Sequence, residues 1–302
     1  SLLGTTTLNE SSNPVKSWTS FFSVPKGEDD IRMVYDASKS GLNDSIWVPR
    51  FPLPTINTHL RAVEPGTWMG DLDIGEMFLN FPLHSSLQEL CGVDLTHYVE
   101  KLSPKVLKVT PAWAMRQIAW TRCAMGLRSS PYQAVQGALV AEEMVLGNPG
   151  DQANVFRWDR VVTNLPGSDS YDPRRSWVYK VRRDGSLAAD LFTYVDDQRA
   201  CAANELDCIS ACRRCGSMNN FLGVQDAPRK RRDPNMEPGP WSGSVITTDG
   251  GLVCVLITND KWLKAQGYVE ELEAMQEADK PVSRKRLETI RGFLQYITRT
   301  YP

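Results

Sequence analysis

The sequence predicts an α+β protein, because short strand patterns joined by tight turns alternate with helices that have clear start signals. Apolar residues flank turn residues in period two at 20–36 and 191–202. Apolar residues at helical spacing follow the Ser-Ser-Pro sequence at 129–131, and two further helical patterns fill 260–278 and 283–298, with a break at Pro281 between them. The 302 residues suffice for about two domains or one large multi-lobed domain.

The composition is that of an ordinary globular chain, and the net charge of −2 gives no global sign of nucleic-acid binding. Four basic clusters either line one groove or are solvated faces; they lie at 182–183, 213–214, 229–232 and 284–286. No apolar run approaches the roughly 20 residues of a membrane span, and we expect no membrane partner. Seven cysteines, an odd number, favour reduced thiols and an intracellular location.

Two adjacent aspartates stand at the expected tip of a hairpin. The apolar strand pattern of 191–195 is interrupted by Asp196 and Asp197, and a small apolar pattern resumes at Ala200. Neighbouring carboxylates repel each other and are costly near a core unless a cation lies between them. A divalent metal ion is the usual solution, whereas a solvated Asp-Asp turn is the simpler alternative.

A further carboxylate ends a second expected strand. The stretch 67–83 begins with an apolar strand that carries Asp71 and Asp73, and a helical turn with Phe78 follows. A strand end holds a side chain rigidly, which suits an active-site carboxylate. Asp71 either shares the face of Asp73 or is solvated at the start of the strand.

Cationic residues lie on two other elements. Lys26 and Arg32 fall on the expected 20–36 hairpin, where they clamp a phosphate or serve as surface groups. The helix after 129–131 begins beside Arg128, and its N-terminus suits a phosphate, although a capped helix needs no ligand.

The cysteines at 201, 208, 212 and 215 raise the question of a zinc site. The last three fall on one helix face, at i, i+4 and i+7, whereas structural zinc sites usually pair cysteines on turns. Buried free thiols are therefore the expected state. The remaining expectations are a connector with a helical pattern at 56–63, irregular structure at 88–118, a hairpin insertion at 150–190 with strands at 155–158 and 176–181, a helix from Asn204 to about Asn219, and strands at 221–224, 241–247 and 252–258.

Asp73 at a strand end, the helix after 129–131 and the Asp196-Asp197 hairpin occur in that order along the chain. Together these motifs resemble the reverse transcriptase family of right-hand polymerases over roughly residues 20–260. Phe192–Asp197 looks like the family's Tyr-x-Asp-Asp hairpin, and Leu72–Leu83 resembles its first carboxylate motif. Trp120–Pro131 and Arg32–Asn43 are similar to its helix-entry and fingers motifs, and 222–230 with 241–243 are weaker matches to later palm motifs. The features nearest the tail suggest a Ty3-like or DIRS-like retrotransposon type.

The resemblance implies a right-hand polymerase fold with an antiparallel palm sheet backed by helices. Fingers are expected at 1–50 and 84–128, palm at 51–83 and 129–250, and the start of a thumb at 251–302. The implied activity is RNA-directed DNA polymerisation, in which a dNMP is transferred to a primer 3′-hydroxyl. The chain is expected to be an excerpt of a longer polyprotein, in which RNase H, integrase or recombinase domains can follow.

By the same resemblance, Asp73, Asp196 and Asp197 are catalytic and hold two Mg²⁺ ions, with Mn²⁺ as a possible substitute and the Ile74 carbonyl as a further ligand. The expected nucleotide-binding residues are Lys26, Arg32, Gly75, Glu76, Met77, Phe78, Met125, Gly126 and Lys230. The expected contacts to an RNA or DNA template with its primer are Arg128, Ser130, Pro131, Tyr194, Trp241 and Gly243.

Two of these roles have simpler alternatives, and the chain departs from the family at several positions. Phe78 falls where the family excludes a ribose 2′-hydroxyl and so selects dNTPs, although a Phe in this context is usually core. Lys230 is a proton donor to pyrophosphate or a solvated lysine. Met125 replaces the usual Gln, Ala124 the usual Pro and Ser38 a common Arg, which bears on processivity and fidelity rather than on the metal site.

Two other functions stay open. An RNA-dependent RNA polymerase shares the palm but usually has Gly-Asp-Asp, so Val195 and Phe78 argue against it. A domesticated or inactive nucleic-acid-binding module that keeps the fold without turnover is compatible with the low net charge.

Overall fold

The computed structural model describes residues 5–7, 15–26, 30–99, 117–277 and 283–300. The chain divides into two compact units, each of which has its own core. The first unit comprises Ser1–Pro52, Ile74–Ala141 and Asn219–Gln225, and the second comprises Leu53–Asp73, Glu142–Met218 and Asp226–Pro302. No helix in the described ranges is long and apolar enough to cross a membrane.

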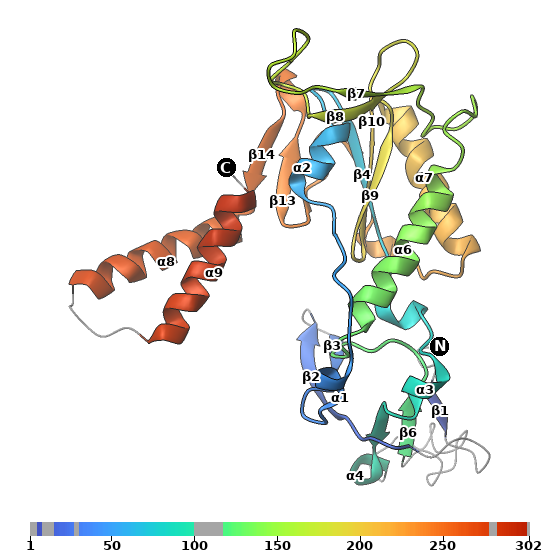
Figure 1. Ribbon diagram of the computed structural model, residues 1–302, viewed down its shortest axis with the longest axis vertical. Coiled ribbons are helices and arrows are strands. Elements are labelled where there is room, and N and C mark those ends of the chain that lie inside the picture. The colour runs from blue at the N-terminus through green and yellow to red at the C-terminus, as the bar shows by residue number, and fades with distance from the viewer. Residues whose placement is uncertain (1–4, 8–14, 27–29, 100–116, 278–282, 301–302) are drawn as a thin grey trace. The chain divides into compact units, whose positions relative to one another are not determined.

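The second unit is built on a four-stranded antiparallel sheet with the strand order β11-β4-β10-β9. Its strands are β4 (Trp68–Asp73), β9 (Asp190–Tyr194), β10 (Asp197–Ala202) and β11 (Arg232–Asn235). The expected strand with the first carboxylates and the expected hairpin before and after the Asp-Asp pair are thus present, and they are neighbours in one sheet (Figure 1).

Helix α7 (Glu205–Phe221) covers one face of this sheet (Figure 1). It begins where the sequence predicts, because Asp207 donates its backbone N–H to the side chain of Asn204 at 2.9 Å. Leu72, Leu191 and Ala200 from the strands pack in one core with Cys208, Ala211 and Cys215 of the helix. The strand expected at 221–224 is wrong: the helix continues to Phe221 and ends in a turn in which Gly223 has a φ of +71°.

The opposite face of the sheet packs against α2 (Ile56–His59), the 3₁₀ turn η1 (Leu60–Ala62) and a small second sheet (Figure 1). That sheet has the order β12-β13-β14, formed by Pro240–Trp241, Ser244–Thr247 and Cys254–Ile257. The short 3₁₀ turn η5 (Asp249–Gly251) connects its last two strands. The core on this side contains Met69, Phe192, Cys201, Trp241 and Ile246.

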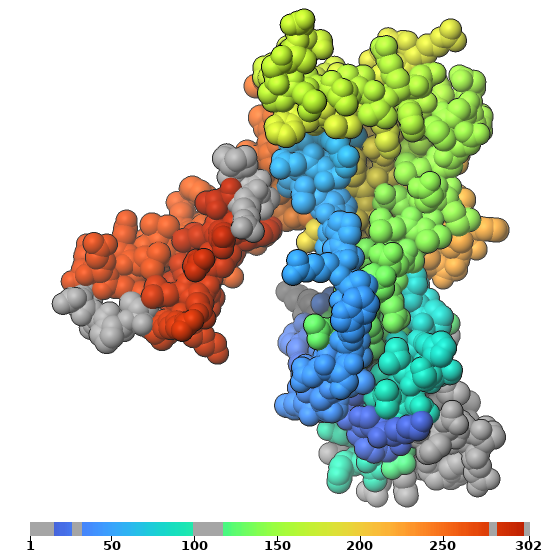
Figure 2. Space-filling model, viewed as in Figure 1, coloured from blue at the N-terminus to red at the C-terminus, as the bar shows by residue number. Residues whose placement is uncertain are grey.

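The expected insertion before β9 is a hairpin of β7 (Arg160–Thr163) and β8 (Val178–Val181). Its first strand begins five residues later than the expected 155–158 segment, because Val155 and Phe156 instead enter the core beneath the sheet. Figure 2 shows the hairpin region, in yellow-green, over the light-blue residues of α2 and η1, and β8 contacts η1.

Helices α8 (Asn259–Glu277) and α9 (Arg284–Thr300) match the two C-terminal helical patterns. Ser283 caps α9, since its hydroxyl accepts a hydrogen bond from the backbone N–H of Arg286 at 3.2 Å. The rings of Tyr268 and Phe293 meet edge to face at 5.4 Å, and Arg286 forms an ion pair with Glu271.

The first unit contains a hairpin of β2 (Ser20–Lys26) and β3 (Asp30–Asp36), as the sequence predicts; the turn at 27–29 lies outside the described residues. A three-stranded sheet has the order β1-β6-β5, formed by Thr5–Thr7, Gln117–Trp120 and Gly92–Asp94. Short helical segments are α1 (Leu42–Ser45), η2 (Met77–Asn80), α3 (Ser85–Gln88) and α4 (Thr96–Val99), and α6 (Ser130–Leu146) begins in this unit.

The expectation of irregular structure at 88–118 is wrong for its two ends. The short strands β5 and β6 pair with each other, and Val93 and Trp120 are buried in the core of the first unit. Strands of three or four residues carry little periodic signal, so their pairing is decided by tertiary contacts. Residues 100–116 of this segment lie outside the described residues.

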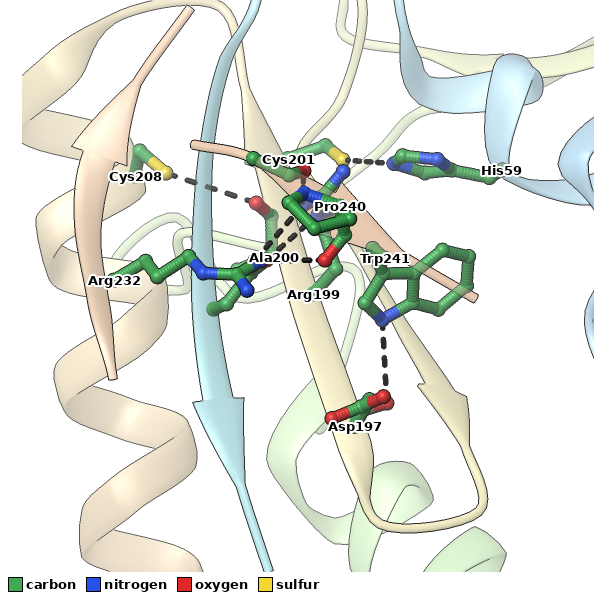
Figure 3. A network of polar contacts seen from close by, with 11 residues as sticks. His59, Asp197, Arg199, Ala200, Cys201, Cys208, Arg232, Pro240 and Trp241 are labelled. Carbon is green, nitrogen blue, oxygen red and sulfur yellow. Dashed lines mark hydrogen bonds and ion pairs between the residues drawn. The ribbon is translucent and has the colours of Figure 1, made fainter. Parts of the chain in front are cut away.

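The cysteines of the second unit are free thiols, as expected. Cys208 lies 3.7 Å from the carbonyl oxygen of Ala200, and the Sγ of Cys201 lies 3.1 Å from Nε2 of His59 (Figure 3). Among the described residues, no group of three or more His, Cys, Asp and Glu side chains is arranged to hold a metal ion.

Candidate active site

Asp73 and Asp197 face each other across two neighbouring strands. They are direct partners in the antiparallel pair of β4 and β10, and Asp197 also pairs with Tyr194 of β9. Side chains directly opposite each other in such a pair lie on the same face of the sheet, with Cβ atoms about 4.5–5.5 Å apart. Two carboxylates that are 124 positions apart along the chain are thus neighbours in space.

The tip of the hairpin formed by β9 and β10 consists of Val195 and Asp196. Val195 has a φ of +56°, in the left-handed region that β-branched residues rarely adopt. Such a conformation costs roughly 1–3 kcal/mol and persists only where the surroundings impose it. The tip is therefore a constrained turn, and the charge of Asp196 within it acts on Asp197.

The pKa of Asp197 reflects the acidic groups that lie around it. Its pKa is raised to about 6, first by burial, then by the charges of Asp196 and Asp73 and by a hydrogen bond to Asp73. The ammonium group of Lys230 acts in the opposite direction. The pKa therefore shows that three carboxyl groups and one lysine share a single electrostatic environment.

Lys230 is the cationic partner of the buried Asp73. Its Nζ donates to Oδ2 of Asp73 at 2.7 Å, and the Asp73 side chain is 5% exposed. Partial burial works against the charged lysine, but the hydrogen bond to Asp73 and the three carboxylate charges outweigh it and raise the pKa of Lys230. At neutral pH the lysine is therefore protonated.

The short turn before β11 holds Lys230 in place. It ends the 3₁₀ turn η4 (Pro228–Lys230), and its N–H donates to the carbonyl of Ala227 at 2.9 Å. Ala227 in turn donates to the backbone carbonyl of Asp73 at 3.0 Å. The lysine is thus attached to the end of β4 through both its main chain and its side chain.

The acidic cluster has the donor chemistry of a site for a hard divalent cation. Oδ1 of Asp73 is buried and receives no hydrogen bond from the described residues when Asp197 is ionised. Carboxylate oxygens are the ligands that Mg²⁺ prefers, and a cation would offset the repulsion between the three acids. The residues therefore fit Mg²⁺ by charge and ligand type, although the described side chains are not already arranged as a metal-binding group.

The residues that follow Asp73 belong to the first unit and form a tight turn. Ile74 and Met77 are buried, Glu76 has a φ of +46°, and Phe78 packs, partly buried, against the core of that unit. The Asn80 side chain donates to the carbonyl oxygens of Gly75 and Met77 at 3.0 and 3.1 Å, and its Oδ1 accepts from Gln225 at 2.7 Å. Sequence reasoning missed Asn80; the signal was a polar residue within an apolar stretch.

The motifs at 32–43 and 120–131, both in the first unit, contact each other directly. The backbone N–H of Tyr35 donates to the carbonyl of Met125 at 2.9 Å. Gly126 has a φ of +102°, and a Cβ there would overlap the carbonyl oxygen of Tyr35. Asn43 joins the motifs, because its amide donates to Gly126 at 2.9 Å and its Oδ1 accepts from the N–H of Arg128 at 2.8 Å. Arg32 is exposed on β3, and Lys26 ends β2.

Ser130 and Pro131 begin α6, as the sequence predicts. Ser129 occupies the N-cap position, where its backbone carbonyl accepts from the N–H of Gln133 at 3.1 Å. Its hydroxyl is buried and makes no hydrogen bond with any described residue, so the side chain does not cap the first turn.

Trp241 supports the hairpin from within the protein. The side chain is 2% exposed, so the contact with a primer that the resemblance implies is not available to it. Its indole Nε1 donates to the backbone carbonyl of Asp197 at 3.3 Å, and its ring lies edge-on to Tyr194 at 6.1 Å. Gly243, with a φ of +86°, accepts a hydrogen bond at its carbonyl from Lys261 of α8 at 3.0 Å.

Asp71 is not solvated, which excludes one of the two alternatives for this residue. It is buried and forms a bidentate ion pair with Arg199, which is also buried. Sequence reasoning missed Arg199; its signal was a lone arginine among the small apolar residues of β10.

Solved structures with a similar fold come from a foamy virus. The protease-reverse transcriptase in complex with double-stranded DNA matches with a TM-score of 0.56 at 16% identity, covering 94% of this chain and 36% of that chain. The protease-reverse transcriptase in complex with an RNA/DNA hybrid matches with a TM-score of 0.54 at 17% identity, covering 94% and 28%.

The chain has a reverse transcriptase-like fold. It spans about a third of the length of these proteins, and at such low identity the likeness shows the fold alone. No protein-family model and no curated protein matches the sequence.

Proposed function

We propose that this chain is the polymerase part of an RNA-directed DNA polymerase of a retrotransposon, Ty3-like or DIRS-like in type. One observation carries the proposal: Asp73 and Asp197 lie opposite each other on adjacent strands, with Asp196 at the hairpin tip and Lys230 bonded to Asp73. The reverse transcriptase-like fold supports it independently. The substrates would be dNTPs and a primer on an RNA or DNA template.

Asp73, Asp196 and Asp197 would hold two Mg²⁺ ions, and the main-chain carbonyl of Ile74 would be a further ligand. When bound, such ions activate the primer 3′-hydroxyl and stabilise the charge that develops on the leaving pyrophosphate. The chain's own contribution is rigid placement of the carboxylates, which two strands and one constrained turn provide.

Lys230 would donate a proton to the pyrophosphate. Its raised pKa keeps it charged at neutral pH, and its bond to Asp73 holds the ammonium group at the acidic cluster. A charged lysine neutralises and protonates a phosphate oxygen as the bond to the leaving group breaks.

The nucleotide would be bound by residues of the first unit. Lys26 and Arg32 would contact the triphosphate, and Gly75, Glu76 and Met77 would shape the sugar pocket. Phe78 would exclude a ribose 2′-hydroxyl. Two further residues, Met125 and Gly126, would contact the nucleotide. The proposed contacts to template or primer are Arg128, Ser130, Pro131, Tyr194 and Gly243. The fingers, palm and thumb ranges given above stand as proposed domains.

A nucleic-acid-binding module without turnover is the second candidate. One observation favours it: as the side chains stand, the described residues contain no preformed metal-binding group, and Lys230 already balances Asp73. The two candidates differ in whether added Mg²⁺ leads to primer extension.

Primer extension on an RNA template tests the proposal. The wild-type chain, supplied with a DNA primer, dNTPs and Mg²⁺ or Mn²⁺, is expected to extend the primer. Asp197→Asn should reduce the rate by about 10³-fold or more, because it removes one charge where ions must bind. Asp184→Asn, on the exposed turn after β8, serves as the control and should retain full activity.

The outcomes separate the candidate functions. Binding of primer–template without extension would replace the polymerase with the binding module. A preference for rNTPs over dNTPs would replace it with an RNA polymerase.

A further inference from the structure

A buried ionic cluster lies one step along the sheet from the acidic site. Asp71 of β4 is the direct cross-strand partner of Arg199 on β10 and of Arg232 on β11. Arg199 donates Nε and Nη2 to the two Asp71 oxygens at 2.6 and 2.8 Å, and Arg232 donates Nη1 to Oδ2 at 3.1 Å. One carboxylate therefore joins three of the four strands.

Stability alone is a poor explanation for this cluster. Arg199 is 0% exposed and the Asp71 side chain is 9% exposed. Removing charges from water is expensive, and apolar residues of similar volume often stabilise a protein as well as or better than a buried ion pair. A buried pair is better suited to specifying one arrangement of the strands.

The cluster fixes the same register that brings the catalytic carboxylates together. Side chains two positions apart in a strand lie on the same face, so Asp71 shares a face of β4 with Asp73, and Arg199 shares a face of β10 with Asp197. The Asp71–Arg199 pair is thus the next pair to Asp73–Asp197 on that face of the sheet. A slip of one residue would break the ion pair and turn one carboxylate to the other face.

The arginines also hold the segment that supports Asp197. Arg199 donates to the carbonyl of Gly239 at 2.9 Å, and Arg232 donates to that of Pro240 (Figure 3). The guanidinium group of Arg199 lies 5.7 Å from the ring centre of Trp241. Because Trp241 donates to the backbone of Asp197, the contacts form a closed loop that begins and ends on β10 (Figure 3).

We propose that the Asp71 network, consisting of Asp71, Arg199, Arg232 and Trp241, is a positioning device that holds Asp73 and Asp197 at the spacing needed to bind divalent cations. The inference rests on the metal site of the proposed function. These four are positioning residues, because they act through the backbone and the strand register rather than by touching substrate.

Replacement of the ion pair by apolar residues tests the inference while retaining volume. In Asp71→Leu with Arg199→Met, no charge is left buried without a partner. The expected result is an affinity for Mn²⁺, measured by electron paramagnetic resonance without substrate, about 10- to 100-fold weaker than that of the wild type, as is typical when supporting contacts of metal ligands are lost. In primer extension, the half-saturating Mg²⁺ concentration should rise while the KM for primer–template stays unchanged.

Two milder variants keep the test valid if the double variant does not fold. Arg232→Met removes a half-exposed partner of Asp71, and Trp241→Phe removes only the indole donor. Both should weaken Mn²⁺ binding. Arg231→Met is the matched control, because Arg231 is similarly exposed but forms its ion pair with Asp226; its Mn²⁺ affinity should equal that of the wild type.

The result that overturns the inference is unchanged Mn²⁺ affinity and Mg²⁺ dependence in folded variants of the network. Absence of Mn²⁺ binding in the wild-type protein would instead overturn the metal site of the proposed function, and the inference with it.

Discussion

Glu142 of α6 carries the carboxyl group with the clearest link to stability. Its pKa is raised to about 7: burial and the charge of Asp190 raise it, and a hydrogen bond from Thr193 and the charge of Lys180 offset part of this increase. Its Oε2 is buried without a hydrogen-bond partner among the described residues. Ionisation of this group is therefore unfavourable in the folded protein.

The pH dependence of stability follows from this shift. The folded state binds the Glu142 proton more tightly than the unfolded state, so the free energy of unfolding should fall as pH rises from about 4.5 to about 7. The full effect is on the order of 3 kcal/mol. Glu142→Gln should remove this dependence and stabilise the protein at pH 8.

Urea unfolding between pH 4 and 8 measures the effect. Glu143→Gln is the matched control, because the neighbouring Glu143 is exposed, and it should keep the wild-type profile. An equal pH dependence in Glu142→Gln and the wild type would contradict the assignment to Glu142.

Phe78 provides a second prediction for a single side chain. Under the proposed function, Phe78→Val should lower the preference for dNTPs over rNTPs by roughly 10- to 100-fold, the range that a change in apolar pocket size commonly produces. The ratio of kcat/KM values in primer extension measures it. Leu79→Val, a neighbour that packs in the same core, should leave the ratio unchanged. Unchanged discrimination in Phe78→Val would show that the ring is core only.

Among the secondary-structure elements, the β9–β10 hairpin carries strain at a known position. Val195→Asn should raise the free energy of unfolding by about 1 kcal/mol, because Asn accepts the left-handed backbone region more readily than a β-branched residue. Denaturant unfolding measures this change. Val161→Asn on the exposed strand β7 should not be stabilising, since Val161 lies in ordinary strand conformation. A loss of stability in Val195→Asn would mean that the Val195 side chain contributes more through packing than the turn costs.

The elements that the sequence predicts well are those with local signals. The Asp-Asp hairpin, the strand before Asp73 and the helix after Asn204 each have turn, capping or periodic residues within a few positions. Strands β5 and β6 lack such signals, because contacts between residues far apart in the sequence decide their pairing. For the same reason the sequence does not predict the Asp71–Arg199 ion pair, whose members are 128 positions apart.

For the candidate site, residue types and their chain order were predictable, whereas the supporting contacts were not. The sequence identifies Asp73, Asp196 and Asp197 as candidate ligands, but it does not reveal that Trp241 is buried beneath Asp197. Nor does it show that Lys230 bonds to Asp73. Such contacts depend on the register between strands, which a single sequence does not display.

The whole molecule consists of two compact units whose chain passes directly from Asp73 in the second unit to Ile74 in the first. The fold matches foamy virus reverse transcriptase structures along 94% of the chain. The three candidate metal ligands all belong to the second unit, whereas Lys26, Arg32 and Phe78 belong to the first.

The central claim is that Asp73, Asp196 and Asp197 bind divalent cations together. Anomalous diffraction from crystals of the chain grown with Mn²⁺ and a dNTP tests it most directly. We predict Mn²⁺ peaks liganded by these three carboxylates, with Lys230 displaced from Asp73. Ordered Mn²⁺ on the dNTP alone, with Lys230 still bonded to Asp73 and the three carboxylates without metal, would contradict the account.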